Sequence, residues 1–327
     1  MSLHLVTGIA GFIGSSIAKA LIERGESVRG IDNFVTGSYE NVAALAGDID
    51  LREGDITDAR VLRQSMEGVS YVLHQAALAS VPRSLRDPQT SHEANVNGTL
   101  NVLLAARDAR VRRVVFAASS SAYGDQPVQP KTEDMMPCPL SPYAVQKLAS
   151  EQYMQVFWRN YGLQTVCLRY FNVFGPHQSA DSPYSGVIAR FIRAMLRGER
   201  PVIFGDGSHT RDFTYVANAV SANLLACTAP AGSVCGQVFN IGTGLAHSLN
   251  QTFRTIAEII GFPHAPIYLQ EREGDICHSL ASIARARKCL GYEPRVSFIE
   301  GLRRTIDWYR DREEATADLA VGASVSA

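Results

Sequence analysis

The stretch Thr7-Gly8-Ile9-Ala10-Gly11-Phe12-Ile13-Gly14 decides how this sequence folds. It follows the apolar run Leu3 to Val6 and opens a helical pattern, so its glycines stand where a strand turns into a helix. Gly8 permits a tight turn, Gly11 lets backbone approach a pyrophosphate, and Gly14 lets the helix pack closely on the strand. The spacing therefore predicts a dinucleotide site, although a glycine-rich turn can also be purely structural.

An acid at the end of the second predicted strand supports that interpretation. Asp32 stands where a carboxylate meets the hydroxyls of the adenosine ribose and repels a 2′-phosphate, which favours NAD over NADP. Alternatively, Asp32 and Asn33 only form a turn, as such pairs often do. The other predicted cofactor contacts are the first residues of the helix and residues at the ends of the second, third and fourth strands: Phe12, Ile13, Asn33, Asp55, Ile56, Ala76 and Ala77.

The first half of the chain alternates short β-branched runs with longer helical patterns, which is typical of a parallel sheet with helices on both faces. The clearest predicted strands are Leu3 to Val6, Val28 to Ile31, Tyr71 to His74, Val114 to Ala117 and Thr165 to Leu168. We expect an α/β fold with a doubly wound parallel (Rossmann) sheet over residues 1–168. Residues 169–312 are expected to form mainly a second, smaller mixed α/β domain, with segments returning to the first, and residues 313–327 a flexible tail.

Composition excludes several classes of function. Hydrophobic residues make up 46% of the 327 residues and the formal net charge is -1, so we expect a globular protein with no general attraction for nucleic acid or a membrane surface. No apolar run approaches the ~20 residues of a membrane span, and no signal peptide precedes the first strand, so a cytoplasmic location is expected. The six cysteines lack zinc-like spacing, and no metal is predicted.

A second motif, Ser141-Pro142-Tyr143-Ala144-Val145-Gln146-Lys147, places Tyr143 and Lys147 one turn apart on one helix face. A phenol with a pKa of ~10 is a poor base at neutral pH unless a nearby cation stabilises the phenolate, and Lys147 can be that cation. Tyr143 and Lys147 are also predicted cofactor contacts, since Lys147 can hydrogen-bond the nicotinamide ribose. By itself the pair is common on exposed helices. The run Ser119-Ser120-Ser121, however, follows the fifth strand at the sheet edge where ligands of such folds bind. A hydroxyl there can orient a sugar hydroxyl that Tyr143 deprotonates.

Four motifs in this order resemble extended short-chain dehydrogenases of the UDP-glucose 4-epimerase group: Gly8-x-x-Gly11-x-x-Gly14, the serine run before Tyr123-Gly124, Tyr143-x-x-x-Lys147, and Leu168 to Gly175. The resemblance covers essentially the whole chain. It implies a tightly held NAD that is regenerated each turnover, and C4 epimerisation of a UDP-sugar through a 4-keto intermediate. It also implies Tyr143 as general base and acid, Lys147 as the residue that tunes it, and Ser119 as the hydroxyl partner with Ser121 close by. Which of the three serines acts stays open.

The same resemblance implies contacts for the nucleotide-sugar. Phe171 would border the cofactor and Asn172 the sugar nucleotide, although both are alternatively packing and turn residues. Arg211 and Arg272 would grip the diphosphate with paired hydrogen bonds. Asp275 would contact the nucleotide ribose. Ser80 and Gln178 belong to segments that resemble bacterial UDP-N-acetylglucosamine 4-epimerases, and Ser279 aligns with a position that is bulky in strict galactose epimerases. A small serine leaves room for a 2-acetamido group. Ser279 is alternatively an ordinary loop serine.

Several alternatives remain at this point. Dehydration is disfavoured because Ser120 and Ser121 stand where related dehydratases carry Asp-Glu. A UDP-glucuronate 4-epimerase or decarboxylase would use the same first steps. A non-catalytic NAD-binding regulatory or scaffold protein would keep the glycines but would not need Ser119, Tyr143 and Lys147 together. The resemblance also implies a homodimer that pairs the helices expected over Ser91 to Ala109 and Tyr143 to Tyr161.

Overall fold

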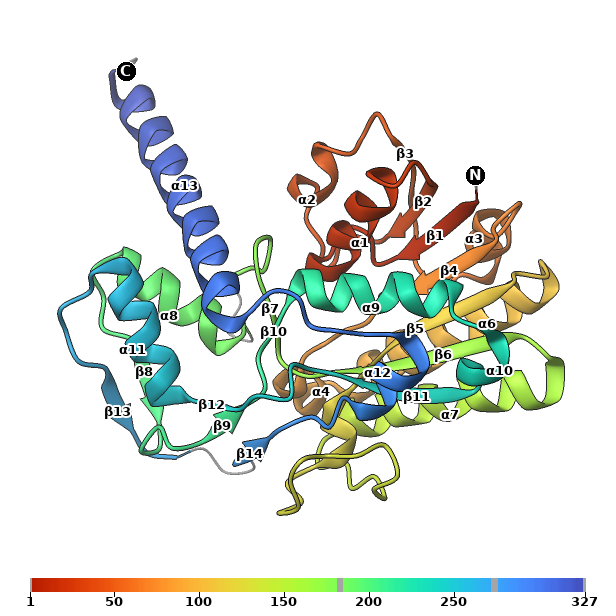
Figure 1. Ribbon diagram of the computed structural model, residues 1–327. Helices are drawn as coiled ribbons and strands as arrows, with labels where there is room; N and C mark the ends of the chain where they lie inside the picture. The colour runs from red at the N-terminus through yellow and green to blue at the C-terminus, as the bar shows by residue number, and fades with distance from the viewer. Residues whose placement is uncertain (1, 181–184, 272–275, 326–327) are drawn as a thin grey trace.

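A seven-stranded parallel sheet forms the larger part of the chain (Figure 1). The computed structural model describes residues 2–180, 185–271 and 276–325, with side chains described as far as Glu313. The strands of this sheet, in spatial order, are β11 (Gln237–Ile241), β6 (Gln164–Tyr170), β5 (Arg113–Ser119), β4 (Tyr71–His74), β1 (Leu3–Thr7), β2 (Ser27–Asp32) and β3 (Ile49–Glu53). All neighbouring pairs run parallel. The predicted doubly wound fold and its five clearest strands are therefore confirmed.

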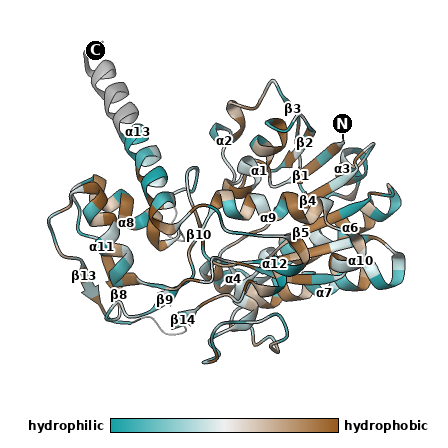
Figure 2. Cartoon of the chain, in the orientation of Figure 1, coloured by the Kyte–Doolittle hydropathy of each residue, from teal (hydrophilic) through white to brown (hydrophobic). Residues whose placement is uncertain are grey.

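Alternate residues of each strand face opposite layers of helices. Leu5 packs in a core cluster with residues of the helices α3 (Ala59–Ser65), α6 (Gly98–Asp108) and α7 (Pro142–Tyr161). Its neighbour Val6 packs in a second cluster with residues of α1 (Phe12–Ile22) and α9 (Val216–Thr228). Because both faces are covered, central strands such as β4 and β5 are apolar along most of their length, whereas the edge strand β3 carries Asp50, Arg52 and Glu53 (Figure 2).

Short helices carry the connections around this sheet. They are α2 (Glu40–Ala43), α4 (Val81–Arg86), α5 (Pro88–His92), the π-helical turn η1 (Glu93–Asn97), the 3₁₀ turn η2 (Ser120–Tyr123), α10 (Ala231–Val234) and α12 (Ala284–Leu290). Helix α5, turn η1 and helix α6 follow one another without a break, so the predicted helix from Ser91 to Ala109 is present but contains a π-helical turn.

A second, smaller region lies beyond the carboxyl edge of the sheet (Figure 1). It is built from short strands and three helices: β7 (Val173–Phe174), α8 (Val187–Leu196), β8 (Val202–Phe204), β9 (Thr210–Arg211), β10 (Thr214–Tyr215), β12 (His247–Ser248), α11 (Leu249–Ile260), β13 (Ile267–Leu269), β14 (His278–Ser279) and α13 (Phe298–Val325). The pairs β8·β13 and β7·β10 run parallel, and β9 lies between β12 and β14.

The chain crosses between the two regions more than once. The apolar run Val238 to Ile241, which follows the start of the smaller region in sequence, pairs with β6 as the last strand of the large sheet. Helix α13 continues to Val325, and the flexibility expected of residues 313–327 stays a prediction. The alanine-rich composition of this end is compatible with a helix, because alanine has the highest helix propensity.

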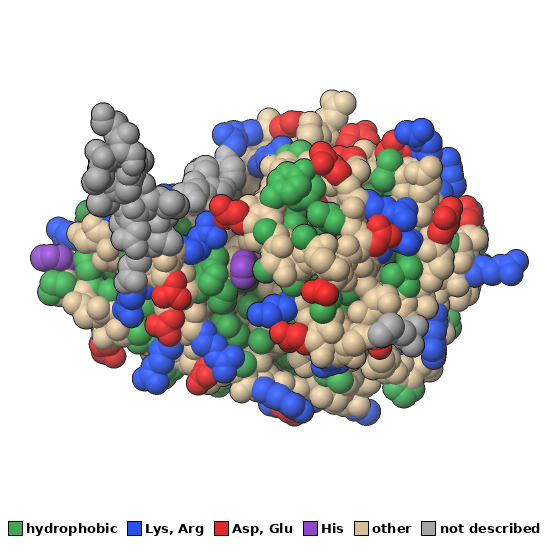
Figure 3. Space-filling model, turned by 90° about the horizontal axis from the view of Figure 1, so that it is seen from above, with side chains coloured by type: hydrophobic (Ala, Val, Ile, Leu, Met, Phe, Trp, Pro, Cys, Tyr) green, Lys and Arg blue, Asp and Glu red, His purple; other side chains and the backbone are tan. Residues whose placement is uncertain are grey.

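The charges on the surface are mixed. Basic and acidic side chains are interspersed over the face seen in Figure 3, in keeping with the net charge of -1. Within residues 2–180, 185–271 and 276–325, no helix combines the length and the apolar character that a bilayer crossing requires.

Candidate active site

The glycine loop between β1 and α1 is held by close backbone contacts. Gly8 has φ +70°, and a Cβ there would lie 2.7 Å from the backbone nitrogen of Ala76. A Cβ on Gly14 would lie 2.1 Å from the carbonyl oxygen of Gly8, so only glycine lets α1 approach the turn. Gly11 is the N-cap of α1 and offers no side chain to the first amides, which stay available for an anion.

Asp32 at the end of β2 closes the other side of this loop. Its Oδ2 accepts the N–H of Ala10 at 2.9 Å and its Oδ1 accepts the N–H of Phe34 at 2.9 Å. Burial raises the pKa of this carboxyl, and the backbone hydrogen bonds oppose the rise. Each carboxylate oxygen has a further lone pair for a ligand hydroxyl. The predicted turn role and the predicted ribose contact are therefore compatible.

A cleft of about 100 Å³ joins these features along the carboxyl edge of the sheet. Of the predicted cofactor residues it is lined by Gly8, Gly11, Asp32, Asn33, Asp55, Ile56, Ala76 and Ala77. Asn33 also donates its amide to Asp55 at 2.6 Å. An uncapped helix start, an acid with free lone pairs and a backbone cradle fit a dinucleotide such as NAD.

Six predicted cofactor residues are not among the described residues that line this cleft: Phe12, Ile13, Gly14, Tyr143, Lys147 and Phe171. Ile13 packs against the core, and Phe12 lines a separate hollow near α13. Their backbone amides nevertheless belong to the uncapped first turn of α1. Phe171, expected to border the cofactor, is fully buried in the core. This burial agrees with the packing role that was the alternative for Phe171, and its contact with the cofactor stays a prediction.

The structure brings Ser119 and Tyr143 together at the sheet edge. Ser119 ends β5 and Tyr143 stands in the first turn of α7, which Ser141 caps. Burial raises the pKa of the Tyr143 phenol, and a hydrogen bond with the Ser119 side chain opposes the rise. Ser121 donates its hydroxyl to Ser119 Oγ at 2.8 Å. Of the three candidate serines, Ser119 thus contacts the phenol and Ser121 supports it.

Lys147 lies one turn along α7 and is 4% exposed. Its Nζ donates to the carbonyl of Ala117 at 2.8 Å and lies 4.7 Å from the ring centre of Phe116. Burial lowers the pKa of Lys147 to about 7. Burial thus raises the pKa of the Tyr143 phenol and also destabilises the ammonium ion of Lys147, and the expectation that Lys147 tunes the phenol stays a prediction.

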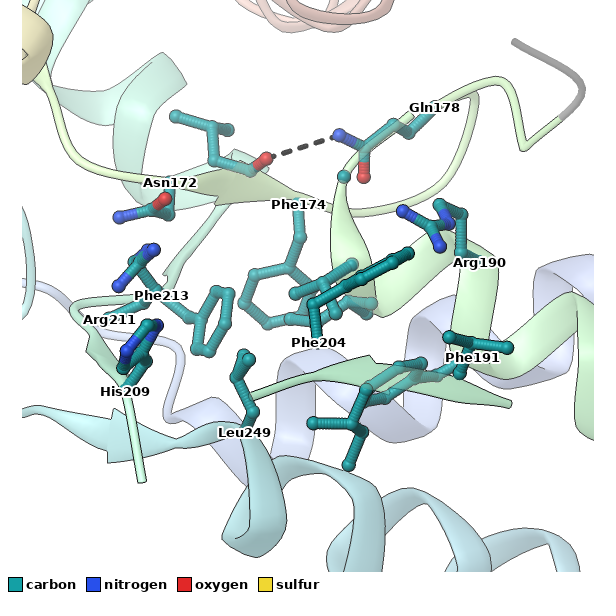
Figure 4. A pocket seen from close by; sticks show the side chains of 16 residues that line it. Asn172, Phe174, Gln178, Arg190, Phe191, Phe204, His209, Arg211, Phe213 and Leu249 are labelled. Carbon is teal, nitrogen blue, oxygen red and sulfur yellow. Dashed lines mark hydrogen bonds between the residues drawn. The ribbon is translucent and has the colours of Figure 1, made fainter. Parts of the chain in front are cut away.

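A second cavity, of about 230 Å³, lies in the smaller region (Figure 4). The rings of Phe174, Phe204 and Phe213 form its apolar middle, with Arg211 at one end and Arg190 at the other. Aromatic rings flanked by guanidinium groups suit a flat base that carries phosphates. We call this cavity the nucleotide pocket.

The predicted substrate residues are partly gathered here. Asn172, Gln178 and Arg211 all line the nucleotide pocket. Arg211 donates to the backbone carbonyls of Thr210 and Cys277, which orients its guanidinium. Arg272 and Asp275 lie outside the described residues.

Two serines that were predicted to contact the nucleotide-sugar, Ser80 and Ser279, are not among the described residues that line the nucleotide pocket. Ser80 caps α4, accepting the N–H of Arg83 at 3.2 Å. Ser279 is 8% exposed and lies opposite Arg211 in the pairing of β14 with β9. Ser279 is therefore next to a predicted phosphate contact, whereas Ser80 has a helix-capping role.

Some residues of these sites were missed from the sequence. Phe174, Phe204, Phe213 and His209 line the nucleotide pocket but come from two-residue or three-residue strands and loops that carry no periodic signal. Gln75 lines the cofactor cleft and joins Asn223 and Tyr170 in a closed ring of hydrogen bonds of 3.1, 2.7 and 3.2 Å. The signal in the sequence that could have identified Gln75 is its position directly after β4.

One group of side chains has a composition that metals use. The ligand atoms of His209, Glu271 and Cys277 lie within 4.8 Å of one another. His209 Nε2 and Glu271 Oε1 are already paired at 3.0 Å, and the positive charge of Arg211 acts on Cys277. The positive charge of this guanidinium disfavours the binding of a metal cation by the same group.

Comparison with known proteins places this geometry in context. The sequence profile described as the NAD dependent epimerase/dehydratase family matches residues 4–242. A UDP-glucose 4-epimerase from Mycolicibacterium smegmatis is 39% identical over 95% of this chain and 99% of its own length. The structure of a UDP-N-acetylglucosamine 4-epimerase from Methanobrevibacter ruminantium in complex with UDP-N-acetylmuramic acid is 39% identical, with TM-score 0.91, over 95% of this chain and 99% of that one. A UDP-glucuronic acid 4-epimerase from Bacillus cereus, solved with UDP-glucuronic acid and NAD, is 31% identical, with TM-score 0.88, over 94% and 99% of the chains.

Proposed function

The chain belongs to the NAD-dependent epimerase/dehydratase family as a UDP-sugar 4-epimerase, and we propose that its preferred sugar carries a 2-acetamido group. The reaction then interconverts UDP-N-acetylglucosamine and UDP-N-acetylgalactosamine, with UDP-glucose and UDP-galactose as further substrates. The observation that carries the chemistry is the interaction of the Tyr143 phenol with the Ser119 side chain, together with the buried Lys147 one turn along α7. A protein that only bound NAD would not need this arrangement.

The residues of the cofactor cleft would hold NAD, with its pyrophosphate at the start of α1 and its ribose at Asp32. When bound, NAD supplies a reversible acceptor for the hydrogen on C4. Tyr143 removes the proton of the C4 hydroxyl and returns it after the 4-keto sugar has turned over in the site. Ser119 orients that hydroxyl. Lys147 adds positive charge beside the forming phenolate when it is protonated.

The raised pKa of Tyr143 makes the Ser119 hydrogen bond important for proton removal. Replacing Ser119 with alanine removes the group that opposes this rise. We expect kcat of Ser119→Ala to fall by roughly 100-fold, the order of magnitude that one positioned acid-base partner contributes. Ser120→Ala is the matched control, because the phenol hydrogen bond involves Ser119. Equal losses in the two variants would contradict the assignment of Ser119.

Support for the acetamido group comes from the size and place of Ser279. This buried serine lies opposite Arg211 across β14 and β9, near the end of the nucleotide pocket where a sugar would follow the diphosphate. A small side chain leaves room that an aromatic ring would fill. The similarity to the Methanobrevibacter enzyme agrees with this choice of substrate class.

Assaying UDP-glucose, UDP-N-acetylglucosamine and UDP-glucuronic acid separately tests the proposal. We expect the acetamido substrate to have the highest kcat/KM. Ser279→Tyr should reduce kcat/KM for that substrate at least tenfold while it spares UDP-glucose, and Ser208→Tyr, at an exposed position, should change neither. A preference for UDP-glucuronic acid, or parallel losses in Ser279→Tyr, would contradict the proposed specificity.

We also propose a homodimer formed by α6 and α7. Val145, Tyr153 and Val156 are exposed on the outer face of α7, and Leu100 and Leu104 are only partly buried on the neighbouring α6. Such an apolar stripe on two adjacent helices suits a two-fold interface. Light scattering should give twice the chain mass for the wild type and a smaller mass for Val156→Glu; a monomeric wild type would contradict the proposal.

A further inference from the structure

A buried polar bridge connects the catalytic helix α7 with the floor of the cofactor cleft. Its centre is Asn95 in the π-helical turn η1, which is 2% exposed. The Oδ1 of Asn95 accepts the N–H of Leu78 at 2.8 Å, and its Nδ2 donates to the carbonyl of Leu78 at 3.3 Å. The same Nδ2 donates to Oε1 of Gln146 at 2.9 Å. Leu78 lines the cofactor cleft, so one side chain holds both structures.

Gln146 is the partner of Asn95 on α7. It immediately precedes Lys147, is 3% exposed, and donates its Nε2 to the carbonyl of Pro88 at 3.2 Å. Its oxygen and its nitrogen therefore have different partners, which fixes the orientation of the amide. A buried amide satisfied at both ends constrains its helix more strongly than an apolar side chain would, because losing either partner leaves a polar group unpaired.

A second contact fixes the position of α7 along its axis. The carbonyl of Asn95 accepts the hydroxyl of Ser150 at 2.8 Å and the hydroxyl of Thr99 at 2.6 Å. Ser150 lies one turn after Gln146, so α7 is joined to η1 at two points on one face. Two such points restrict both rotation and sliding of the helix that carries Tyr143 and Lys147.

A chain of hydrogen bonds through the buried His74 connects this bridge with Thr7, the first residue of the glycine loop. The Thr99 hydroxyl donates to Asn95 and so accepts from Nε2 of His74, at 3.0 Å. The other nitrogen, Nδ1, then accepts the hydroxyl of Thr7 at 2.7 Å, and Thr7 Oγ1 accepts the N–H of Ala76 at 3.2 Å. Burial lowers the pKa of His74 to about 3, so the ring is neutral and this direction of hydrogen bonds is maintained.

We propose that Gln146 is a positioning residue that holds the phenol of α7 in register with the floor of the cofactor cleft. This inference rests on the proposed epimerase function. Its contacts with Asn95 and Pro88 keep Tyr143 and Lys147 at a fixed place relative to Ala76, Ala77 and Leu78. Loss of the bridge shifts these groups against each other, and displacements of about 1 Å at a reacting centre cost up to ~100-fold in rate.

Gln146→Leu tests the proposal, because leucine fills similar space but makes neither hydrogen bond. We expect kcat to fall about tenfold with KM changed less than twofold, since Gln146 is not in the nucleotide pocket. Amide hydrogen exchange of the peptides that contain Leu78 and Asn95 should accelerate at least tenfold, in protein with or without NAD. Gln152→Leu, at an exposed position of the same helix, is the matched control for both measurements.

Gln146→Glu separates positioning from general damage to the fold. A protonated glutamic acid accepts from Asn95 and donates to Pro88 as glutamine does, whereas the carboxylate cannot donate. The kcat of this variant, relative to wild type, should therefore recover as the pH is lowered. If wild type is active but Gln146→Leu matches Gln152→Leu in kcat and in exchange, the inference is overturned. A wild type that is inert on every UDP-sugar removes the proposed function instead, while the exchange measurement still tests the bridge.

Discussion

The cofactor cleft and the nucleotide pocket are built in different ways. The cleft is made mainly of backbone: a glycine turn, an uncapped helix and short side chains at the ends of parallel strands. The nucleotide pocket is made mainly of large side chains from several separate segments of the chain, including Phe174, Phe204, Phe213 and Arg211. A backbone site tolerates few changes, whereas a side-chain site can be retuned one residue at a time. We therefore expect chemistry to be lost abruptly in the first region and affinity to change gradually in the second.

The sharpest test of this difference is a substitution of Tyr143, in the first turn of α7. Tyr143→Phe keeps the ring but removes the proton carrier, so kcat should fall by ~1,000-fold or more, with little change in substrate affinity. Tyr153→Phe, at an exposed tyrosine ten residues along α7, should remain fully active. Steady-state assays of both variants on UDP-N-acetylglucosamine check this. Comparable activity of Tyr143→Phe and wild type would rule out the proposed mechanism.

The catalytic side also carries an energetic cost that the nucleotide pocket does not. Burial lowers the pKa of Lys147 from 10.5 to about 7, so between these values the unfolded chain binds a proton that the folded chain does not. The free energy of unfolding therefore rises with pH across this window, and protonated Lys147 destabilises the fold most at pH 7 and below. The penalty is on the order of 5 kcal/mol.

Lys147→Met should accordingly be more stable than wild type near pH 7, although inactive, and its advantage should shrink as the pH approaches 10.5. Urea unfolding at pH 7 and pH 9, at equal nicotinamide content, measures this difference. Lys288→Met, at an exposed position of α12, serves as the control for loss of a lysine. An advantage of Lys147→Met that is the same at both pH values would contradict the assigned cause.

The backbone region was also the part that the sequence predicted best. Gly8, Gly14 and Asp32 act within a few residues of a strand end, so their spacing along the chain determines their spacing in the structure. Phe204 and Phe213 line one pocket only because segments far apart in the sequence fold together, and no local pattern encodes that arrangement. The low pKa of Lys147 was likewise not predicted, since it depends on how completely the surrounding layers bury the ammonium group.

A smaller effect is expected from a substitution in the glycine loop of the cofactor cleft. Gly14→Ala places a Cβ 2.1 Å from the carbonyl oxygen of Gly8, so α1 must shift away from the turn that would hold the pyrophosphate. We expect a loss of about 2 kcal/mol in stability and less nicotinamide bound per chain. Gly47→Ala meets no atom within 4 Å and is the matched control. Thermal unfolding and the nicotinamide released on denaturation report both quantities, and a fully loaded Gly14→Ala protein would show that the close packing is not required.

The smallest predicted effect belongs to the nucleotide pocket. Arg211 presents a planar fork that can donate two hydrogen bonds to a diphosphate, and its Nη1 is anchored by the carbonyls of Thr210 and Cys277. Arg211→Lys keeps the charge but loses the paired donors, so KM for the UDP-sugar should rise about tenfold, equivalent to about 1.4 kcal/mol, while kcat stays within twofold. Arg254→Lys, on the exposed face of α11, should leave both constants unchanged. A fall in kcat with constant KM would instead place Arg211 in the chemistry, and the division between a backbone region for catalysis and a side-chain region for affinity would fail at that residue.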